Sequence, residues 1–451
     1  MQEACDPNCT AMSELTNTLD PAACERRRSH YTLLLLTALS AVSFMDRQIL
    51  AVMIEPIKAE FALSDLQVGI VSSLGFAVGF GLLGLPLARL ADRGHRRNLV
   101  VLSRGLGGLI TALGGAAAGF WQLLILRSGT ALSEAGGSGC AISMISDLFP
   151  PWRRSRAMSV LTSGASIGAM MAFVVGASLA ARFGWRMTLV MVGLASLLLA
   201  GVVRLTVSEP QRENLNALSA RRAAGRAVDR GDLREILAAR VPRWLIVAAA
   251  SNMFVLYSFG TWNFAYMVRT HGFSLQQAGW IAGASGAASV LGGLFSGALA
   301  DRLVRGGDAR WQLGVPVLGL AIAIPLAYVY LLLPAGRLTQ VWGLMIAYAF
   351  FVTWWSAPTY AALSLVVAPE RRATANSMLL ISGYVLGLGA GPIVTGLASS
   401  LLAARYPHDA LRYSLMGVSA LLVPGWYALF RAMQAYPAAS LMMREEAVAV
   451  P

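Results

Sequence analysis

Four ionisable residues lie inside two stretches of sequence that are otherwise apolar enough to cross a membrane. Asp46 and Arg47 are adjacent in the first stretch, and Arg127 and Glu134 share the second. A charge at the bilayer centre costs about 2.5–3.5 kcal/mol on insertion scales, so such residues mark functional sites by default. Their formal charges sum to zero, and protonation of either carboxylate would leave one arginine ready for an anion. The sequence therefore predicts a proton and substrate site at these four residues.

The spacing of these residues places their charges at a common depth. Arg127 and Glu134 are seven residues apart, so they lie on one face of a helix. At the helical rise, Asp46 and Glu134 each lie about 21–22 Å from the end at which their helix enters the membrane. We expect Arg127 to bind the anionic group of the substrate, which leaves Glu134 less well neutralised and ready to take up a proton. A structural ion-pair cluster is the alternative.

The composition is that of an integral membrane protein. Charged residues make up only 13% of the 451 residues, whereas soluble proteins have about 25%. The net charge of +13 comes from arginines between the hydrophobic segments, which indicates positive-inside loops and argues against a nucleic-acid partner. No nucleotide-binding loop, nucleophile elbow or metal-ligand spacing occurs, so we expect neither an enzyme nor a cofactor. A membrane acyltransferase is the remaining enzymatic alternative.

Apolar runs of about twenty residues predict transmembrane helices. Twelve such runs occur, at 31–57, 67–90, 99–119, 121–146, 157–180, 187–207, 244–268, 276–300, 312–334, 340–367, 376–403 and 413–432. We therefore predict an all-α integral membrane protein with two six-helix halves, 31–207 and 244–432. A cytoplasmic linker, 208–243, joins them, and cytoplasmic tails cover 1–30 and 433–451. Residues 232–240 form either a short amphipathic helix or part of a plain linker.

An internal repeat relates the two halves. "SDLQVG" at 64–69 matches "SLQQAG" at 274–279, "ARLADR" at 88–93 matches "GALADR" at 297–302, and "RRSRA" at 153–157 matches "RRATA" at 371–375. Parallel halves related by an axis along the membrane normal are the architecture of the major facilitator superfamily. The loop "ARLADRGHRR" resembles the signature G-x-x-x-D-R-x-G-R-R of that superfamily, with Ala88 and His95 in place of its glycines. The resemblance implies a charged latch that gates one side, made by Asp92, Arg93, Arg96, Arg97, Asp147, Arg153, Asp301 and Arg302.

Within the superfamily, the chain resembles the spinster family of lipid transporters. The matching segments are "FMDRQIL", "LSDLQVGIVSSLGFAVGFGLLGLPLARLADR" and "RSGTALSEAGGSGCAISMISDLFPPWRRSRA". The resemblance implies proton-linked carboxylates and an arginine that binds a head group. Organic anion:cation symporters, which carry sugar acids, are the rival family, because they also have D-R in the first helix and an arginine and a glutamate in the fourth.

The second half has aromatic and amide residues where the first half has charges. We predict a substrate cavity lined by Asn252, Tyr257, Trp262, Asn263, Trp354, Trp355 and Ser356. An ionic half facing an aromatic half suits an amphiphilic lipid, with a lysophospholipid or sphingolipid-like molecule as substrate, and an organic anion is the alternative. We expect a functional monomer surrounded by membrane lipid in a bacterial inner membrane. Both termini should be cytoplasmic. The proton is the expected coupling ion.

Overall fold

The computed structural model describes residues 21–74, 77–79, 87, 95–209, 230–368 and 371–449, and every regular element within these ranges is helical. The elements are α2 (Pro21–Phe61), α3 (Asp65–Gly69), η1 (Ile70–Leu74), α5 (Arg96–Gly114), α6 (Phe120–Leu148), α7 (Pro151–Met171), η2 (Ala172–Gly176), α8 (Ala177–Thr206), α10 (Arg230–Ala238), α11 (Arg240–His271), α12 (Leu275–Arg305), α13 (Trp311–Leu332), α14 (Leu338–Val352), η3 (Thr353–Trp355), α15 (Ser356–Leu365), α16 (Arg372–Gly383), η5 (Tyr384–Ala390), α17 (Gly391–Leu402), α18 (Ala410–Ser419) and α19 (Leu422–Ala449).

These helices agree with the twelve expected spans. Eight helices in the described part of the chain are long and apolar enough to cross a membrane. One of them, Arg156–Thr206, covers two expected spans. The backbone leaves the helical conformation between these two spans at Gly184, where φ is 75°. The third and fourth expected spans correspond to α5 and α6, whose charged residues lower their mean hydropathy. The second expected span, 67–90, lies partly outside the described residues.

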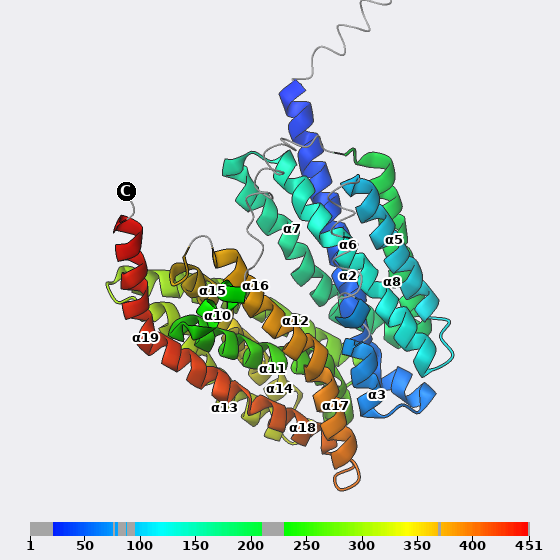
Figure 1. The fold of residues 1–451 in the computed structure, drawn as a ribbon. Helices are drawn as coiled ribbons and strands as arrows, with labels where there is room; N and C mark the ends of the chain where they lie inside the picture. The colour runs from blue at the N-terminus through cyan, green and yellow to red at the C-terminus, as the bar shows by residue number, and fades with distance from the viewer. Residues whose placement is uncertain are drawn as a thin grey trace, which may run out of the picture.

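The chain forms two helical bundles that meet at α3 and α17 (Figure 1) and also where α12 packs against η2 and α7. The first bundle runs from α2 to α8 and the second from α11 to α19. We call the end of the molecule where α2 leads into α3 and α17 leads toward α18 the closed end. We call the opposite end, where α5, α7 and α16 begin, the arginine-rich end, because Arg96, Arg153 and Arg372 lie at these helix starts.

The first repeated motif forms equivalent helix starts in the two halves. At the start of α3, the Ser64 hydroxyl accepts a hydrogen bond from the backbone N–H of Gln67, and the Gln67 side chain accepts one from the backbone N–H of Ser64. Ser274 and Gln277 form the same reciprocal cap at the start of α12. This arrangement satisfies two backbone donors that a helix start otherwise leaves unpaired.

The glycine that ends this motif lies against the opposite half in both repeats. A Cβ atom at Gly69 would be 2.6 Å from the carbonyl oxygen of Pro392 in α17, and one at Gly279 would be 2.3 Å from the carbonyl oxygen of Phe173 in η2. No side chain fits at these distances without a shift of the backbone. The two glycines therefore let each half pack directly on the backbone of the other.

Two segments between or after the bundles are helical, and the first agrees with the short amphipathic helix that was one of the two alternatives for residues 232–240. Helix α10 forms in the expected linker, where Ile236 is buried and Glu235 pairs with Arg371. The next helix, α11, already begins at Arg240, inside that linker. Helix α19 continues to Ala449, so most of the expected tail extends the last spanning helix.

Candidate functional site

The four predicted charges meet between α2 and α6 in two ion pairs. Nη1 of Arg47 lies 3.2 Å from Oε2 of Glu134. Nη1 of Arg127 lies 4.0 Å from Oδ1 of Asp46. This pairing differs from the expectation that Arg127 is the partner of Glu134. Consecutive residues of a helix point about 100° apart, so Asp46 and Arg47 project toward different neighbours.

Asp46 lies behind Arg127 and is enclosed by helices of the first half. The residue is 5% exposed, and its Oδ1 accepts a hydrogen bond of 2.8 Å from the hydroxyl of Thr111 in α5. Arg127 also donates to the backbone carbonyls of Asp46, at 3.2 Å, and Arg47, at 2.5 Å. The guanidinium of Arg127 is thus held by α2 itself, in addition to its pairing with Asp46.

Arg47 projects toward the second half of the molecule. Its Nη2 donates to the hydroxyl of Tyr257 in α11 at 3.5 Å, and its Cζ lies 5.7 Å from the centres of both the Tyr257 and Phe44 rings. The Arg47–Glu134 pair therefore lies where the two halves face each other.

Arg104 in α5 is a fifth buried charge, which sequence reasoning missed. Its side chain donates to the hydroxyls of Ser138, at 3.1 Å, and Ser133, at 3.4 Å, and the residue is only 1% exposed. Gly137 makes room for it, because a Cβ atom there would lie 2.3 Å from its Nε. Arg104 interacts electrostatically with both Asp46 and Glu134.

The position of Arg104 explains why the sequence did not reveal it. The residue lies only about 8 Å inside the expected span, a depth from which an arginine can ordinarily extend to the membrane surface. With Arg104 included, three arginines and two carboxylates share the buried cluster, so its formal charge is +1 when all five groups are ionised. An unbalanced buried charge is costly, and an anion bound beside the cluster would balance it.

One cavity adjoins this cluster, and a second cavity lies beside the first. The ionic cavity has a volume of about 350 Å³ and is lined by Arg47, Arg127, Tyr257 and Tyr384, among other residues. The apolar cavity has a volume of about 310 Å³, and its lining includes Phe173, Phe259, Phe264 and Val352.

The two cavities lie side by side and share part of their walls. Five residues line both of them: Gln48, Ser166, Ala169, Leu256 and Gly260. Each cavity falls in the range of about 300–1,000 Å³ that small-molecule sites occupy. The site therefore places a charged compartment beside an apolar one.

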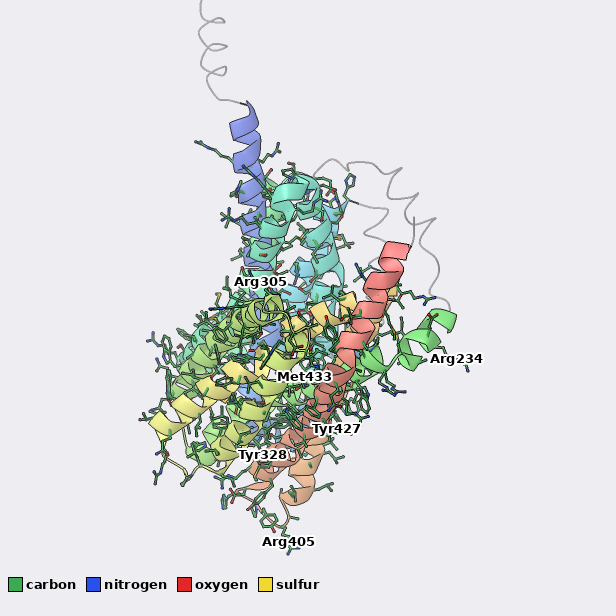
Figure 2. The ribbon with its side chains drawn as sticks, turned by 90° about the vertical axis from the view of Figure 1, so that its left-hand side faces the viewer. Arg234, Arg305, Tyr328, Arg405, Tyr427 and Met433 are labelled. Carbon is green, nitrogen blue, oxygen red and sulfur yellow. The ribbon has the colours of Figure 1, made fainter. Side chains whose placement is uncertain are left out.

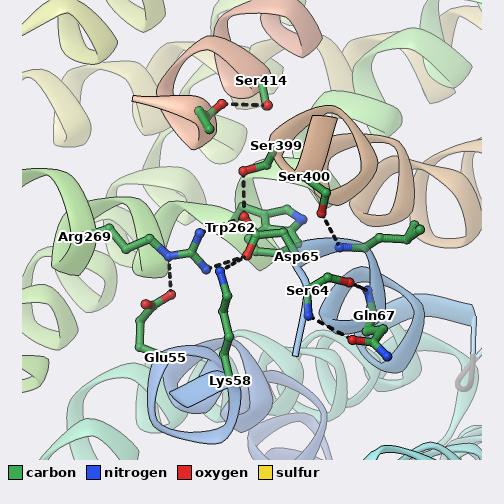
Figure 3. Close-up of polar contacts among 12 residues, drawn as sticks. Glu55, Lys58, Ser64, Asp65, Gln67, Trp262, Arg269, Ser399, Ser400 and Ser414 are labelled. Carbon is green, nitrogen blue, oxygen red and sulfur yellow. Dashed lines mark hydrogen bonds and ion pairs between the residues drawn. The ribbon is translucent and has the colours of Figure 1, made fainter. Parts of the chain in front are cut away.

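A second charged network joins the two halves at the closed end (Figure 3). Arg269 of α11 contacts Oε1 of Glu55 at 2.6 Å through Nε and Oδ2 of Asp65 at 2.8 Å through Nη1. Asp65 also accepts from Lys58 and from the Ser399 hydroxyl, both at 2.6 Å. Sequence reasoning did not find this network, because contacts among residues of four separate segments cannot be inferred from spacing.

Sequence comparison identifies the family. A profile described as Major Facilitator Superfamily matches residues 36–392 of the chain. The chain belongs to this superfamily. As a multi-pass membrane protein of the superfamily, it is a transporter and not an enzyme.

Individual members of the superfamily add detail. An "MFS-type efflux pump" of Mycolicibacterium smegmatis is 35% identical, and the match covers 88% of this chain and 91% of that protein. A "Probable L-galactonate transporter" of Escherichia coli is 24% identical, with coverage of 81% and 82%. The crystal structure of a bacterial homologue of the human lysosomal transporter spinster, in an inward-facing and unoccupied conformation, superposes with a TM-score of 0.80 at 27% identity, covering 91% of this chain and 98% of that one.

Two of the predicted cavity residues line the cavities of this superfamily member. Tyr257 lines the ionic cavity, and Asn263 lines the apolar cavity. Asn263 also accepts a hydrogen bond of 2.6 Å from the hydroxyl of Tyr330.

The other five predicted cavity residues line neither cavity and have packing or backbone partners. Trp262 is fully buried and donates to the carbonyl oxygen of Pro392 at 2.9 Å. Asn252 donates to the carbonyl of Ala248 at 2.8 Å, within its own helix. Trp354 packs against three phenylalanine rings of the second half. Trp355 is buried beside the Tyr360 ring, and Ser356 donates to the carbonyl of Thr353.

The predicted gating residues that the structure describes fall into two groups. Arg96 pairs with Asp147 at 2.5 Å and with Glu209 at 3.0 Å, and the backbone N–H of Arg97 donates to Glu209 at 2.7 Å. These contacts all lie within the first half and the start of the linker that follows it. In the described part of the chain, Arg153, Asp301 and Arg302 are exposed and form no ion pair. Asp92 and Arg93 of the superfamily's signature loop lie outside the described residues.

Proposed function

We propose that the chain is a secondary-active, alternating-access transporter of an anionic amphiphile, with a lysophospholipid or a sphingolipid-like molecule as substrate. The observation that carries the proposal is that the ionic and apolar cavities lie side by side and share lining residues. An anionic head group beside Arg47 would balance the surplus charge of the cluster, while an acyl chain would occupy the apolar cavity. Burial of each methylene group stabilises such a complex by about 0.8 kcal/mol.

We further propose that substrate and proton share the Arg47–Glu134 pair. A head group that accepts hydrogen bonds from Arg47 competes directly with Glu134, whose carboxylate lies 3.2 Å from the same guanidinium. A carboxylate that loses its counter-ion in a site of low dielectric takes up a proton more readily. Substrate binding and proton uptake would then favour each other by reciprocal linkage.

Orientation follows from the distribution of arginines. Loops rich in arginine face the cytoplasm in most membrane proteins, so the arginine-rich end would be cytoplasmic and the closed end external. Arg269 and its partners would then seal the external side, and the central cavities would open inward, as in the spinster homologue with which the structure superposes.

A sugar acid or a similar organic anion is the second candidate substrate. The galactonate transporter of Escherichia coli supports it by sequence similarity, and the surplus buried charge would suit any carboxylate. The apolar cavity distinguishes the two candidates, because a sugar acid has no group that would fill a space walled by Phe173, Phe259 and Phe264.

The efflux pump of Mycolicibacterium smegmatis supports export as the direction of transport.

Flux measurements in proteoliposomes test the proposal. Labelled long-chain and short-chain lysophosphatidylglycerol and labelled galactonate are compared, each with and without a pH gradient. We expect saturable flux of the lysophospholipids that the gradient stimulates, and no flux of galactonate. Phe173→Ala should weaken affinity for the long chain more than for the short one, because it removes part of the wall of the apolar cavity.

The matched control is Phe295→Ala. Phe295 is 48% exposed on the outer surface of the second half, where it packs against Phe350 and Trp354. This substitution should leave the dependence on chain length unchanged. Flux of galactonate without flux of lysophospholipid would establish the second candidate and contradict the first.

A further inference from the structure

An aromatic and arginine cluster lies on the surface of the second half, remote from both cavities. The rings of Trp244 in α11 and Tyr427 in α19 meet edge to face, with their centres 6.1 Å apart. Cζ of Arg431 lies 5.9 Å from the Trp244 ring centre and 5.7 Å from that of Tyr427, and its Nη1 donates to the Tyr427 hydroxyl at 2.8 Å. Cζ of Arg243 lies 5.9 Å from the same Trp244 ring. Two guanidinium groups therefore flank one indole.

Neither arginine of this cluster has an acidic partner within the described residues, and both are exposed. Helix α11 contains no aspartate or glutamate at all. The nearest acidic residue that follows Arg431 in α19 is Glu445, about 21 Å further along the helix. Glu235 in the neighbouring helix α10 is already paired with Arg371. Within the described residues, the cluster thus presents two positive charges that no carboxylate neutralises.

The depth of the cluster corresponds to the head-group layer of a bilayer. Helix α11 ends at His271 near the closed end, and Arg243 lies 28 residues earlier. That separation is about 42 Å along the helix, close to the full bilayer thickness of about 40–45 Å and longer than the hydrocarbon core of about 30 Å. In Figure 2, Tyr427 lies on α19 between Arg405, at the tip beyond α17, and Arg234 in α10. The cluster therefore borders the leaflet at the arginine-rich end.

We propose that Arg243, Trp244, Tyr427 and Arg431 bind the head group of an anionic phospholipid in this leaflet. Guanidinium groups form paired hydrogen bonds with phosphate oxygens, and tryptophan and tyrosine favour the boundary between head groups and hydrocarbon. Basic pockets between transmembrane helices are established sites for such lipids. The bond from Arg431 to the Tyr427 hydroxyl uses one of its five N–H groups, so the side chain is held in place with donors remaining for a phosphate. The acyl chains would lie along the exposed apolar side chains of α11 and α19, such as Val247 and Val423.

Native mass spectrometry of the full-length, delipidated protein tests this site. Phosphatidylglycerol or phosphatidylcholine is titrated into the wild-type protein, into Arg243→Gln/Arg431→Gln, and into the control Arg305→Gln/Arg310→Gln. The control removes two exposed arginines, Arg305 at the end of α12 and Arg310 in the loop that follows, at the same end of the molecule but away from the aromatic cluster. We expect the first double variant to bind phosphatidylglycerol roughly tenfold more weakly, while the control binds it like the wild type and phosphatidylcholine binding is equal in all three.

Three results would overturn the proposal. The first is equal binding of phosphatidylglycerol by the wild type and Arg243→Gln/Arg431→Gln. The second is an equal loss in the control, which would indicate general surface charge. The third is displacement of the bound lipid by an equal concentration of glycerol 3-phosphate, which would make the site one for a soluble anion. If the double variant does not fold, Arg431→Gln alone gives the same comparison, because this guanidinium contacts both rings.

Discussion

Arg47 and Glu134 form an ion pair of 3.2 Å between α2 and α6, and Arg47 also reaches the Tyr257 hydroxyl across the interface between the two halves. The arginines of both pairs, Arg47 and Arg127, line the ionic cavity. Arg47 extends toward the second half, whereas Arg127 is also held by two backbone carbonyls of α2. This difference in position assigns the two pairs different roles. Arg47 can exchange Glu134 for a substrate anion, while Asp46 remains enclosed beside Thr111.

Arg47→Gln should weaken substrate binding about 10- to 100-fold, because it removes charge-assisted hydrogen bonds worth about 1.5–3 kcal/mol. Arg47→Lys should recover only part of the affinity, since an ammonium group cannot form the paired bonds of a guanidinium. Equilibrium binding of labelled lysophosphatidylglycerol measures both effects. Arg182→Gln, an exposed arginine in α8, is the control and should bind like the wild type. Wild-type affinity in Arg47→Gln would show that the head group binds elsewhere.

Arg269→Gln should destabilise the closed end, because Glu55 and Asp65 lose their shared partner from the other half. Spin labels at Ala59→Cys and Ala403→Cys, both exposed beside the Arg269 network, report the separation of the halves by pulsed electron paramagnetic resonance. In Arg269→Gln we expect a population with longer distances between the two spin labels. The control is Arg405→Gln, which replaces an exposed arginine at the same end and should show no such population. Identical distance distributions in the two variants would exclude Arg269 as a lock.

The closed end should not respond to moderate acidification. Asp65 is the first residue of α3 and precedes the second expected span. Its burial alone would raise its pKa, but hydrogen bonds from Arg269, Lys58 and Ser399 lower the pKa to about 2. An ionised carboxylate with a lowered pKa stabilises the closed arrangement above its ordinary pKa of about 3.9, and this contribution is lost only as the pH falls through the lowered value. The spin-label distances should therefore be constant between about pH 5 and pH 8. Opening within that window would mean that Asp65 is not held in this network.

Gly69→Ala and Gly279→Ala should each hinder closure, because the added methyl group would clash with a backbone carbonyl of the opposite half. Overpacking of this kind costs about 1–3 kcal/mol, enough to populate a separated state in the same spin-label measurement. Gly201→Ala is the matched control in α8, where a Cβ atom has nothing within 4 Å. Distances that are equal in all three variants would show that the repeated motif only caps helices.

The sequence predicted the architecture and the identity of four buried charges, but it could not predict their pairing. The seven-residue spacing of Arg127 and Glu134 places them on one face in any straight helix. Which arginine of α2 or α6 meets which carboxylate depends on how the helices are rotated about their axes, and no spacing records that rotation.

The aromatic residues show the same limit. Tyr257 and Trp262 are five residues apart in α11, so they project about 140° apart and cannot face one compartment. Tyr257 lines the ionic cavity, whereas Trp262 is buried against Pro392. From their residue types, both residues were predicted to line the substrate cavity, because either aromatic ring can contact a substrate. The repeated S-x-x-Q-x-G motif was more informative, since its capping pattern depends only on local sequence.

The central claim is that a substrate anion and a proton share the Arg47–Glu134 pair, and one measurement tests it most directly. The affinity for lysophosphatidylglycerol is determined as a function of pH for the wild type and for Glu134→Gln, which mimics the protonated carboxyl group. We predict that the wild-type affinity rises as the pH falls, and that Glu134→Gln binds tightly at every pH, with flux that no longer depends on a pH gradient. If the two proteins show the same pH dependence, Glu134 does not couple the proton to the substrate, and the pair is structural.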